Sequence, residues 1–333
     1  MANTDKSSSH QPNKEPKPLL VIHRIPDYNF FFHNRIAPFF SLLDPLATSI
    51  DTLSFLRSHG AAARALVCVG PSPLRKDILD CLPSLECVIT SCIGVDHIDL
   101  SECRRRGISV ANVGEAFSDD TADCAVGLLL DVLRKVSSGN RFARAGSWVQ
   151  IPVFPLGSRL KGKRVGIVGL GSIGSRIARR LLSFGCDIAY IATKKKPSIS
   201  FPYYANIHDL AVDSDILIVC CSLTKKTHHM INKDVLSALG NEGVIINVGR
   251  GALIDEEELV RFLVEGKIKG AGLDVFKNEP NVPKELFGLE CVVLSPHHSV
   301  WTNESFKAAE DTVVANLEAF FLNKPLITPI KWE

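Results

Sequence analysis

Three glycines between two apolar segments give this chain its clearest chemical signal. Arg164–Val168 is predicted as a short buried strand, and Gly169-Leu170-Gly171-Ser172-Ile173-Gly174 follows it directly. A helix is predicted to begin inside this hexapeptide and to stop at Gly185, before a second strand at Cys186–Ile191. At this spacing the first glycine permits a tight turn, the second lets backbone approach a pyrophosphate, and the third allows close helix–strand contact. The segment predicts a dinucleotide on the helix N-terminus, and an empty α/β crossover is the alternative.

The residues after the second predicted strand contain no acid. Ala192-Thr193-Lys194-Lys195-Lys196 occupies the position where a site for NAD usually has Asp or Glu to bind the ribose 2′-hydroxyl. Three cations and a hydroxyl suit a 2′-phosphate, which a carboxylate would repel. The sequence therefore predicts NADP(H) as the preferred cofactor and NAD(H) as the second choice, against the alternative of a solvated lysine loop.

Four side chains with functional chemistry follow later predicted strands. Arg250 lies two residues after the strand that ends at Val248, and Asp274 ends the next strand. Glu279 follows in the loop, and His297 comes just after the last predicted strand. Because ligands of open α/β sheets bind beyond the carboxyl ends of the strands, these side chains are expected to converge on the crevice that holds the nicotinamide. A strand-end Arg or Asp taken alone is more often part of a surface ion pair.

The elements that position these residues alternate between strand and helix. In the first third of the chain, strands are predicted at Leu19–His23, Arg64–Val69, Glu86–Thr90 and Ile108–Ala111, with helices at Pro45–His59, Pro73–Cys81 and Leu100–Arg106. Beyond the glycine loop, further strands are predicted at Ile216–Cys221, Gly243–Val248, Gly270–Val275 and Val292–Leu294, before a long helix at Asn303–Leu322. This alternation predicts an α/β protein with two Rossmann-like domains, each a parallel sheet with helices on both faces, and an active site in the cleft between them.

Two segments before the glycine loop are more apolar or irregular than a lone domain requires. Ser118-Asp119-Asp120 offers N-caps for a helix at Thr121–Arg134, whose apolar middle is predicted to be buried in its own domain or against a second subunit. Gly139–Leu160, with glycines, prolines and Trp148, is predicted to protrude. Both segments favour a homodimer.

Composition narrows the function. The 333 residues predict about two domains, and a net charge of +2 gives no basic field for nucleic acid. No apolar run is long enough to span a membrane. The ten cysteines show neither a CxxC pair nor metal-ligand spacing, so we expect reduced intracellular thiols and no metal. Residues 1–17 are predicted to form a disordered tail, and the cytoplasm is the default location.

At this point the sequence resembles a known family. The motifs SCIGVDHIDL, DDTAD, VGIVGLGSIG, NVGRGALID, GAGLDVFKNEP and SPHH occur in the order and spacing of the D-isomer-specific 2-hydroxyacid dehydrogenases. Within that family they are most similar to the plant-type glyoxylate/hydroxypyruvate and hydroxyphenylpyruvate reductases. The resemblance implies NADPH-dependent reduction of hydroxypyruvate and glyoxylate to D-glycerate and glycolate, with hydroxyphenylpyruvate as the alternative substrate.

The resemblance also implies a division of labour. Arg250 would clamp the substrate carboxylate and polarise the carbonyl, because a guanidinium is a fixed planar donor. His297 would act as general acid, and Glu279 would hold its tautomer and stabilise the imidazolium. Asp274 corresponds to the residue that orients the nicotinamide amide, and Val248-Gly249 would run alongside the cofactor.

The remaining implied positions concern the substrate and the domains. Ile93, Gly94 and Val95 resemble the family's backbone anchor for the substrate carboxylate, and Trp148 corresponds to a tryptophan that reaches the partner subunit's active site. Residues 18–114 with 300–333 would form a discontinuous substrate-binding domain, and residues 115–299 the NAD(P)-binding domain.

Some features leave alternatives open. Close relatives have Ser-Arg-Ser where this chain has Ala192-Thr193-Lys194, so lysine must replace an arginine. The usual small residues after the acid are replaced by His298-Ser299-Val300-Trp301, which would narrow the pocket. His298 competes with His297 by adjacency, although the family's acid directly follows the proline, while His228 and His229 are interpreted as structural. A non-enzymatic alternative is a cofactor-sensing scaffold like the C-terminal-binding corepressors, which retain the Arg, Glu and His.

Overall fold

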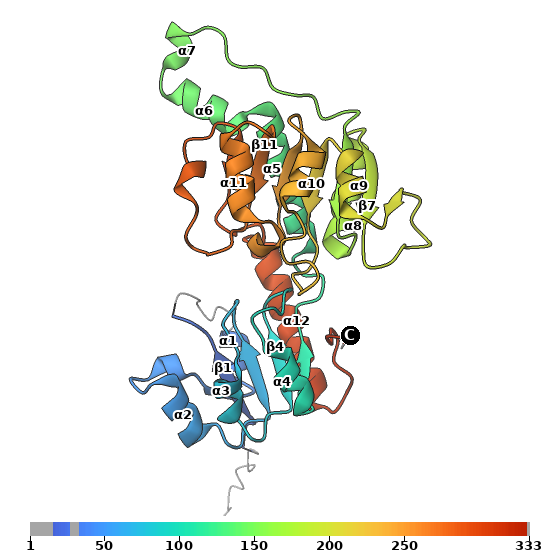
Figure 1. Cartoon of the computed structure of the whole chain (residues 1–333). Helices are drawn as coiled ribbons and strands as arrows, with labels where there is room; N and C mark the ends of the chain where they lie inside the picture. The colour runs from blue at the N-terminus through green and yellow to red at the C-terminus, as the bar shows by residue number, and fades with distance from the viewer. Residues whose placement is uncertain (1–15, 27–32, 332–333) are drawn as a thin grey trace, which may run out of the picture. The chain divides into compact units, whose positions relative to one another are not determined.

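The computed structural model describes residues 16–26 and 33–331, so the predicted tail lies outside the described residues except for Pro16 and Lys17. The chain divides into two compact units (Figure 1). Unit 1 comprises residues 1–112 and 313–333, and unit 2 comprises residues 113–312. The chain thus leaves unit 1 once, completes unit 2, and returns to unit 1 within its last helix.

Unit 1 is built on a five-stranded sheet in which every pairing is parallel, in the order β2-β1-β3-β4-β5. Its strands are β1 (Leu19–His23), β2 (Ser41–Leu43), β3 (Ala65–Cys68), β4 (Cys87–Thr90) and β5 (Ser109–Ala111). Its helices are α1 (His33–Ile36), the 3₁₀ turn η1 (Pro45–Ala47), α2 (Thr52–His59), α3 (Lys76–Asp80) and α4 (Leu100–Arg105), together with the end of α12 (Asn303–Phe321).

The core of unit 1 lies on both faces of this sheet. Side chains of α2, α3 and α4, such as Leu56, Leu79 and Cys103, pack on the face that presents Val21 and Leu66. Successive strand residues point to opposite faces, and the residues of the other parity, such as Leu20, Ile22 and Ile89, are equally buried. The strands of unit 1 are therefore continuously apolar, without polar alternation, because both faces of the sheet are covered.

Two helices of unit 1 are shorter than predicted. The predicted helix Pro45–His59 is η1 followed by α2, because Asp51 starts a new helix by accepting a hydrogen bond from the Ser54 N–H. The predicted helix Pro73–Cys81 begins only at Lys76, because the N–H of Leu74 bonds to the carbonyl of His97 instead.

Unit 2 holds a seven-stranded sheet, again with every pairing parallel, in the order β12-β11-β10-β9-β6-β7-β8. The strands are β6 (Arg164–Val168), β7 (Asp187–Ile191), β8 (Tyr203–Tyr204), β9 (Ile216–Val219), β10 (Val244–Asn247), β11 (Gly270–Leu273) and β12 (Val292–Leu294). Two parallel sheets flanked by helices confirm the predicted α/β class with two Rossmann-like folds.

Helices cover both faces of the second sheet (Figure 1). On one face lie α5 (Ser118–Arg134) and α8 (Ser172–Ser183). On the other lie α9 (Ile207–Val212), α10 (Lys233–Leu239) and α11 (Glu256–Val264), with the 3₁₀ turns η2 (Gly251–Leu253) and η3 (Lys284–Leu286) near them. The apolar middle of α5, including Ala125 and Leu129, is buried in this core, which answers the question left open by its sequence.

The segment after α5 projects from unit 2 (Figure 1). It comprises α6 (Val136–Arg144), α7 (Ser147–Gln150) and an irregular stretch up to residue 160. Trp148, Val149 and Leu156 are 67%, 92% and 94% exposed. No helix in the described part of the chain is both long and apolar enough to cross a bilayer. All ten cysteines lie within that part, and each is a free thiol.

Candidate active site

Two of the three glycines after β6 have a steric reason to be glycine, and the third stands in open space. Gly169 has φ 102°, and a Cβ on it would lie 2.6 Å from Cβ of Cys221. A Cβ on Gly174 would lie 2.1 Å from the carbonyl oxygen of Gly169, so this helix turn can pack there only without a side chain. Around Gly171, by contrast, no atom lies within 4 Å of such a Cβ. The loop is therefore tight at its first and third glycines and open at its second, as a pyrophosphate requires.

The open glycine stands at the N-terminus of α8. Gly171 is the N-cap and Ser172 begins the helix, whose first turn contains no acidic residue. The free N–H groups and the positive end of the helix dipole at this position favour a phosphate group. Leu170 and Ile173 are buried and half-buried in the core beneath the loop, so they hold its backbone in position. These residues fit a dinucleotide.

The acid-free segment of residues 192–196, where the ribose 2′-phosphate of the cofactor is predicted to bind, follows β7. The Gly169 N–H donates to the carbonyl of Ile191 at 2.9 Å, which fixes the start of this segment beside the glycine loop. Thr193, Lys194 and Lys195 are exposed, whereas Lys196 is half-buried. The structure thus presents two cations and a hydroxyl to solvent there, without an acidic side chain in the segment.

His297 and Glu279 form a close pair. Nδ1 of His297 lies 2.6 Å from Oε2 of Glu279, and the other carboxylate oxygen accepts the N–H of Phe276 at 2.9 Å. Burial alone would raise the pKa of Glu279, but the hydrogen bonds from His297 and Phe276 and the Arg250 charge together hold it below its usual value. An ionised carboxylate only accepts, so Nδ1 carries the proton and Nε2 is left for a ligand.

A buried carboxylate anchors the turn that carries His297. Asp274 is 0% exposed, and its oxygens accept the backbone N–H groups of His298 at 3.0 Å and Ser299 at 3.2 Å. It also accepts the Ser295 hydroxyl, and its own carbonyl accepts the N–H of His297 at 2.8 Å. This network holds His297 at φ 51°, a conformation that residues other than glycine seldom adopt. Asp274 thus positions His297, a role that the sequence analysis did not predict for it.

The neighbouring histidine has a different partner. Nδ1 of His298 lies 2.6 Å from the Ser295 hydroxyl, while His297 alone of the two pairs with Glu279. His228 and His229 stack on each other, with ring centroids 3.9 Å apart. The structure therefore gives the two adjacent histidines distinct surroundings.

Arg250 stands on a turn that the buried Asn247 holds. The Asn247 side chain donates to the carbonyl of Arg250 at 3.0 Å and accepts the N–H of Gly249 at 3.1 Å. Nη1 of Arg250 donates to the carbonyl of Gly249 at 2.8 Å. Asn247 was missed in the sequence, where the signal was a polar residue ending an otherwise apolar strand.

The turn of Arg250 packs directly against the loop of Glu279. A Cβ on Gly251 would lie 1.9 Å from the carbonyl carbon of Phe276, whose N–H bonds to Glu279. The Arg250 charge accordingly contributes to the lowered pKa of Glu279. Unit 2 therefore brings together three of the residues predicted from separate strand ends, namely Arg250, Glu279 and His297.

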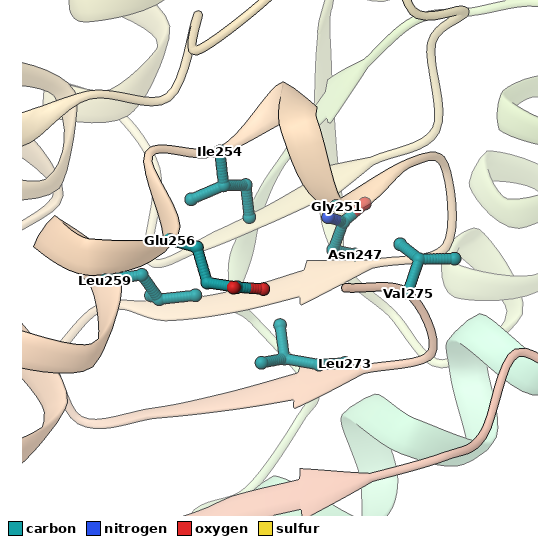
Figure 2. Close-up of a pocket in the computed structure, with 7 residues that line it drawn as sticks. All are labelled: Asn247, Gly251, Ile254, Glu256, Leu259, Leu273 and Val275. Atoms are coloured by element: carbon teal, nitrogen blue, oxygen red, sulfur yellow. The ribbon is translucent and has the colours of Figure 1, made fainter. Parts of the chain in front are cut away.

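A small cavity lies behind this turn (Figure 2). It is lined by Asn247, Gly251, Ile254, Glu256, Leu259, Leu273 and Val275. Its volume of about 10 Å³ is sufficient for about one water molecule, so it is not a substrate site.

The other predicted substrate residues lie elsewhere in the chain. Ile93, Gly94 and Val95 are half-buried in unit 1, in the loop after β4. This loop is fastened where Asn112 donates to the carbonyl of Ile93 at 2.8 Å and where the Ile98 N–H donates to the carbonyl of Val95 at 3.0 Å. Trp148 stands exposed on α7.

A dinucleotide loop, a histidine–carboxylate pair and an arginine, all at the carboxyl ends of one parallel sheet, are typical of a nicotinamide-dependent oxidoreductase. The family model of the D-isomer specific 2-hydroxyacid dehydrogenase NAD-binding domain matches residues 126–299, just over half of the chain. The chain belongs to this family, as its motifs predicted.

Named relatives and solved structures agree with this membership. The chain is 50% identical to glyoxylate/hydroxypyruvate reductase HPR3 of Arabidopsis thaliana, over 96% of this chain and 98% of that protein. It is 46% identical to hydroxyphenylpyruvate reductase of Plectranthus scutellarioides, over 83% and 88%. A crystal structure of an NADPH-dependent glyoxylate/hydroxypyruvate reductase from Sinorhizobium meliloti, in complex with NADP and malonate, is similar with a TM-score of 0.86 at 36% identity, over 94% and 97%.

Proposed function

We propose that this protein reduces small 2-oxo acids, hydroxypyruvate and glyoxylate, to D-glycerate and glycolate with NADPH. The observation that carries the proposal is the 2.6 Å pair of His297 and Glu279 beside the Arg250 turn. A 2-oxo acid offers a carboxylate for a guanidinium and a carbonyl for a proton donor, which are the two groups that this arrangement supplies.

In the proposed reaction each residue has a defined role. Arg250 binds the carboxylate in a planar fork and polarises the carbonyl. The nicotinamide, when bound, supplies hydride to the carbonyl carbon. His297 gives the Nε2 proton to the carbonyl oxygen, and Glu279 stabilises the imidazolium before this transfer. Asp274 keeps the turn of His297 in position, and Ile93, Gly94 and Val95 would bind the carboxylate through backbone N–H groups. Val248 and Gly249 would lie alongside the cofactor.

The proposed preference for NADPH rests on the acid-free segment with Thr193, Lys194 and Lys195. The S. meliloti relative, described as NADPH-dependent, supports it. The test is kcat/KM with NADPH and with NADH on hydroxypyruvate, glyoxylate and hydroxyphenylpyruvate. Equal or better use of NADH would refute the cofactor preference, and a higher value on hydroxyphenylpyruvate would select the activity named for the P. scutellarioides relative. Absence of turnover on every substrate, with cofactor still bound, would favour a cofactor-sensing scaffold.

We also propose a homodimer formed through the projecting segment, residues 136–160. Val149, Val153 and Leu156 expose most of their apolar surface there, while α5 needs no partner because its own core buries it. If Trp148 contributes to the partner's site, Trp148→Ala should change the ratio of kcat/KM between hydroxypyruvate and hydroxyphenylpyruvate without lowering the melting temperature. The cytoplasmic location remains a prediction from the sequence.

A further inference from the structure

Two tyrosines fasten the loop that follows β7. Tyr190 is fully buried in β7, and its hydroxyl accepts the N–H of Lys196 at 2.9 Å. Tyr203, on the neighbouring strand β8, donates its hydroxyl to the carbonyl of Ala192 at 3.5 Å. The two rings pack with centroids 5.5 Å apart. Ala192 and Lys196 are the first and last residues of the acid-free segment, so the two hydroxyls hold its two ends.

Backbone bonds reinforce the same two ends. The carbonyl of Ile191, just before the segment, accepts the N–H of Gly169, and the carbonyl of Lys196 accepts the N–H of Ile199 at 3.1 Å. Between these fixed points only three residues, Thr193, Lys194 and Lys195, form an exposed tip. These bonds fix the backbone on both sides of the tip, and so set the points from which the Thr193, Lys194 and Lys195 side chains project.

The hydroxyl of Tyr190 is informative because of its surroundings. The ring belongs to the apolar cluster formed by α5, α8 and the sheet, where phenylalanine would pack equally well. A buried hydroxyl without a partner is costly, and this one finds its partner in the backbone of the loop. The Tyr190 hydroxyl therefore stabilises the loop rather than the apolar core.

We propose that Tyr190, supported by Tyr203, is a positioning residue that sets the discrimination between NADPH and NADH. It does so by holding Thr193, Lys194 and Lys195 where they receive the 2′-phosphate. A loop that is already ordered loses less conformational entropy when it binds the phosphate than a free lysine loop would. The inference rests on the proposed NADPH preference.

The test compares Tyr190→Phe with Tyr204→Phe as the matched control. Tyr204 is the second tyrosine of β8, next to Tyr203, but its hydroxyl bonds to the carboxylate of Asp213 at 2.8 Å, away from the loop. The full-length protein is titrated calorimetrically with adenosine 2′,5′-bisphosphate and with AMP, which need no turnover. Because one hydrogen bond is lost, the Tyr190→Phe variant should bind the bisphosphate about two- to tenfold more weakly than the wild type does. Its affinity for AMP should equal that of the wild type. Tyr204→Phe should bind both as the wild type does.

The outcomes separate the two proposals. If the wild type binds AMP as tightly as the bisphosphate, the NADPH preference itself is wrong. If the wild type prefers the bisphosphate but Tyr190→Phe weakens both ligands equally or neither, the positioning role is wrong. Should circular dichroism show that Tyr190→Phe is unfolded, Tyr203→Phe replaces it. That variant must give a smaller loss for the bisphosphate alone, and the absence of such a loss overturns the inference. In steady-state kinetics, Tyr190→Phe should raise the KM for NADPH and leave the KM for NADH and kcat unchanged.

Discussion

At the scale of single residues, the proposed chemistry depends on which ring nitrogen of His297 is free. Glu279 accepts from Nδ1, so rotation or retautomerisation of the ring would break that hydrogen bond, and the N–H of Phe276 holds the carboxylate in place. Because the pKa of Glu279 is depressed, its carboxylate is ionised throughout the range in which an imidazole titrates. Between about pH 5 and 8 Glu279 therefore remains an ionised acceptor for the Nδ1 proton of His297.

Replacing His297 by Gln should lower kcat by about a hundred- to ten-thousand-fold, the usual contribution of general acid catalysis. Binding of NADPH, measured by fluorescence titration, should survive, because the histidine does not hold the pyrophosphate. His208→Gln is the control, since His208 is an exposed histidine beside the carboxylate of Asp209. A loss of less than tenfold in kcat would remove His297 from the proton-donor role.

Replacing Glu279 by Gln should move the alkaline limb of kcat/KM to lower pH. Reduction consumes a proton, so the ring must be protonated, and activity falls as the pH rises past its titration. Without the carboxylate the imidazolium loses its stabilising charge, so the decline of kcat/KM begins at a lower pH. The measurement is the pH profile of kcat/KM for hydroxypyruvate with saturating NADPH. An unmoved limb would contradict the assignment of the pair, whatever His297→Gln does.

At the scale of elements, the sequence predicted what depends on apolar periodicity and on glycine. The buried strands, the glycine loop and the strand-end positions of Arg250 and His297 all follow from residue type and spacing. The edge strands β2 and β8 were missed because they contain no β-branched residue, unlike β5 and β12, which are similarly short and were predicted. The sequence also could not predict that Asn247 holds the turn of Arg250 or that Asp274 holds the turn of His297. Both sets of hydrogen bonds join groups that meet only once the chain has folded.

Two glycines in helices should respond oppositely to the same substitution. Gly174→Ala forces a Cβ to within 2.1 Å of a carbonyl oxygen, so the glycine loop must shift and dinucleotide binding should be lost. Gly127→Ala in α5 meets no atom within 4 Å, so it should stabilise the helix by about 0.5–1 kcal/mol. Calorimetric melting should then rise by about 1–4 °C for Gly127→Ala. Equal NADPH binding by Gly174→Ala and the wild type would contradict the steric argument.

At the scale of the whole molecule, the projecting segment offers a test of assembly. Val149→Asp with Leu156→Asp places two charges on the exposed apolar surface, so the proposed dimer should dissociate to monomers. Val264→Asp is the control, because Val264 is an exposed apolar residue on α11, outside the segment. Sedimentation equilibrium measures the mass. A wild-type monomer at working concentration would contradict the dimer, and a dimer that persists in the double variant would exclude this segment as its interface.

The division of the chain also has a consequence for its synthesis. Unit 2 is inserted within unit 1, which the chain rejoins at residue 313. In this last part of the chain the N–H of Ile330 donates to the carbonyl of Val110 and the hydroxyl of Thr328 to the carbonyl of Asn112. On the ribosome, the first strands of unit 1 must wait, incompletely covered, while two hundred residues of unit 2 emerge and fold. We expect nascent chains stalled before residue 313 to hold a protease-resistant unit 2 and a protease-sensitive N-terminal portion, and so to depend on chaperones during that interval.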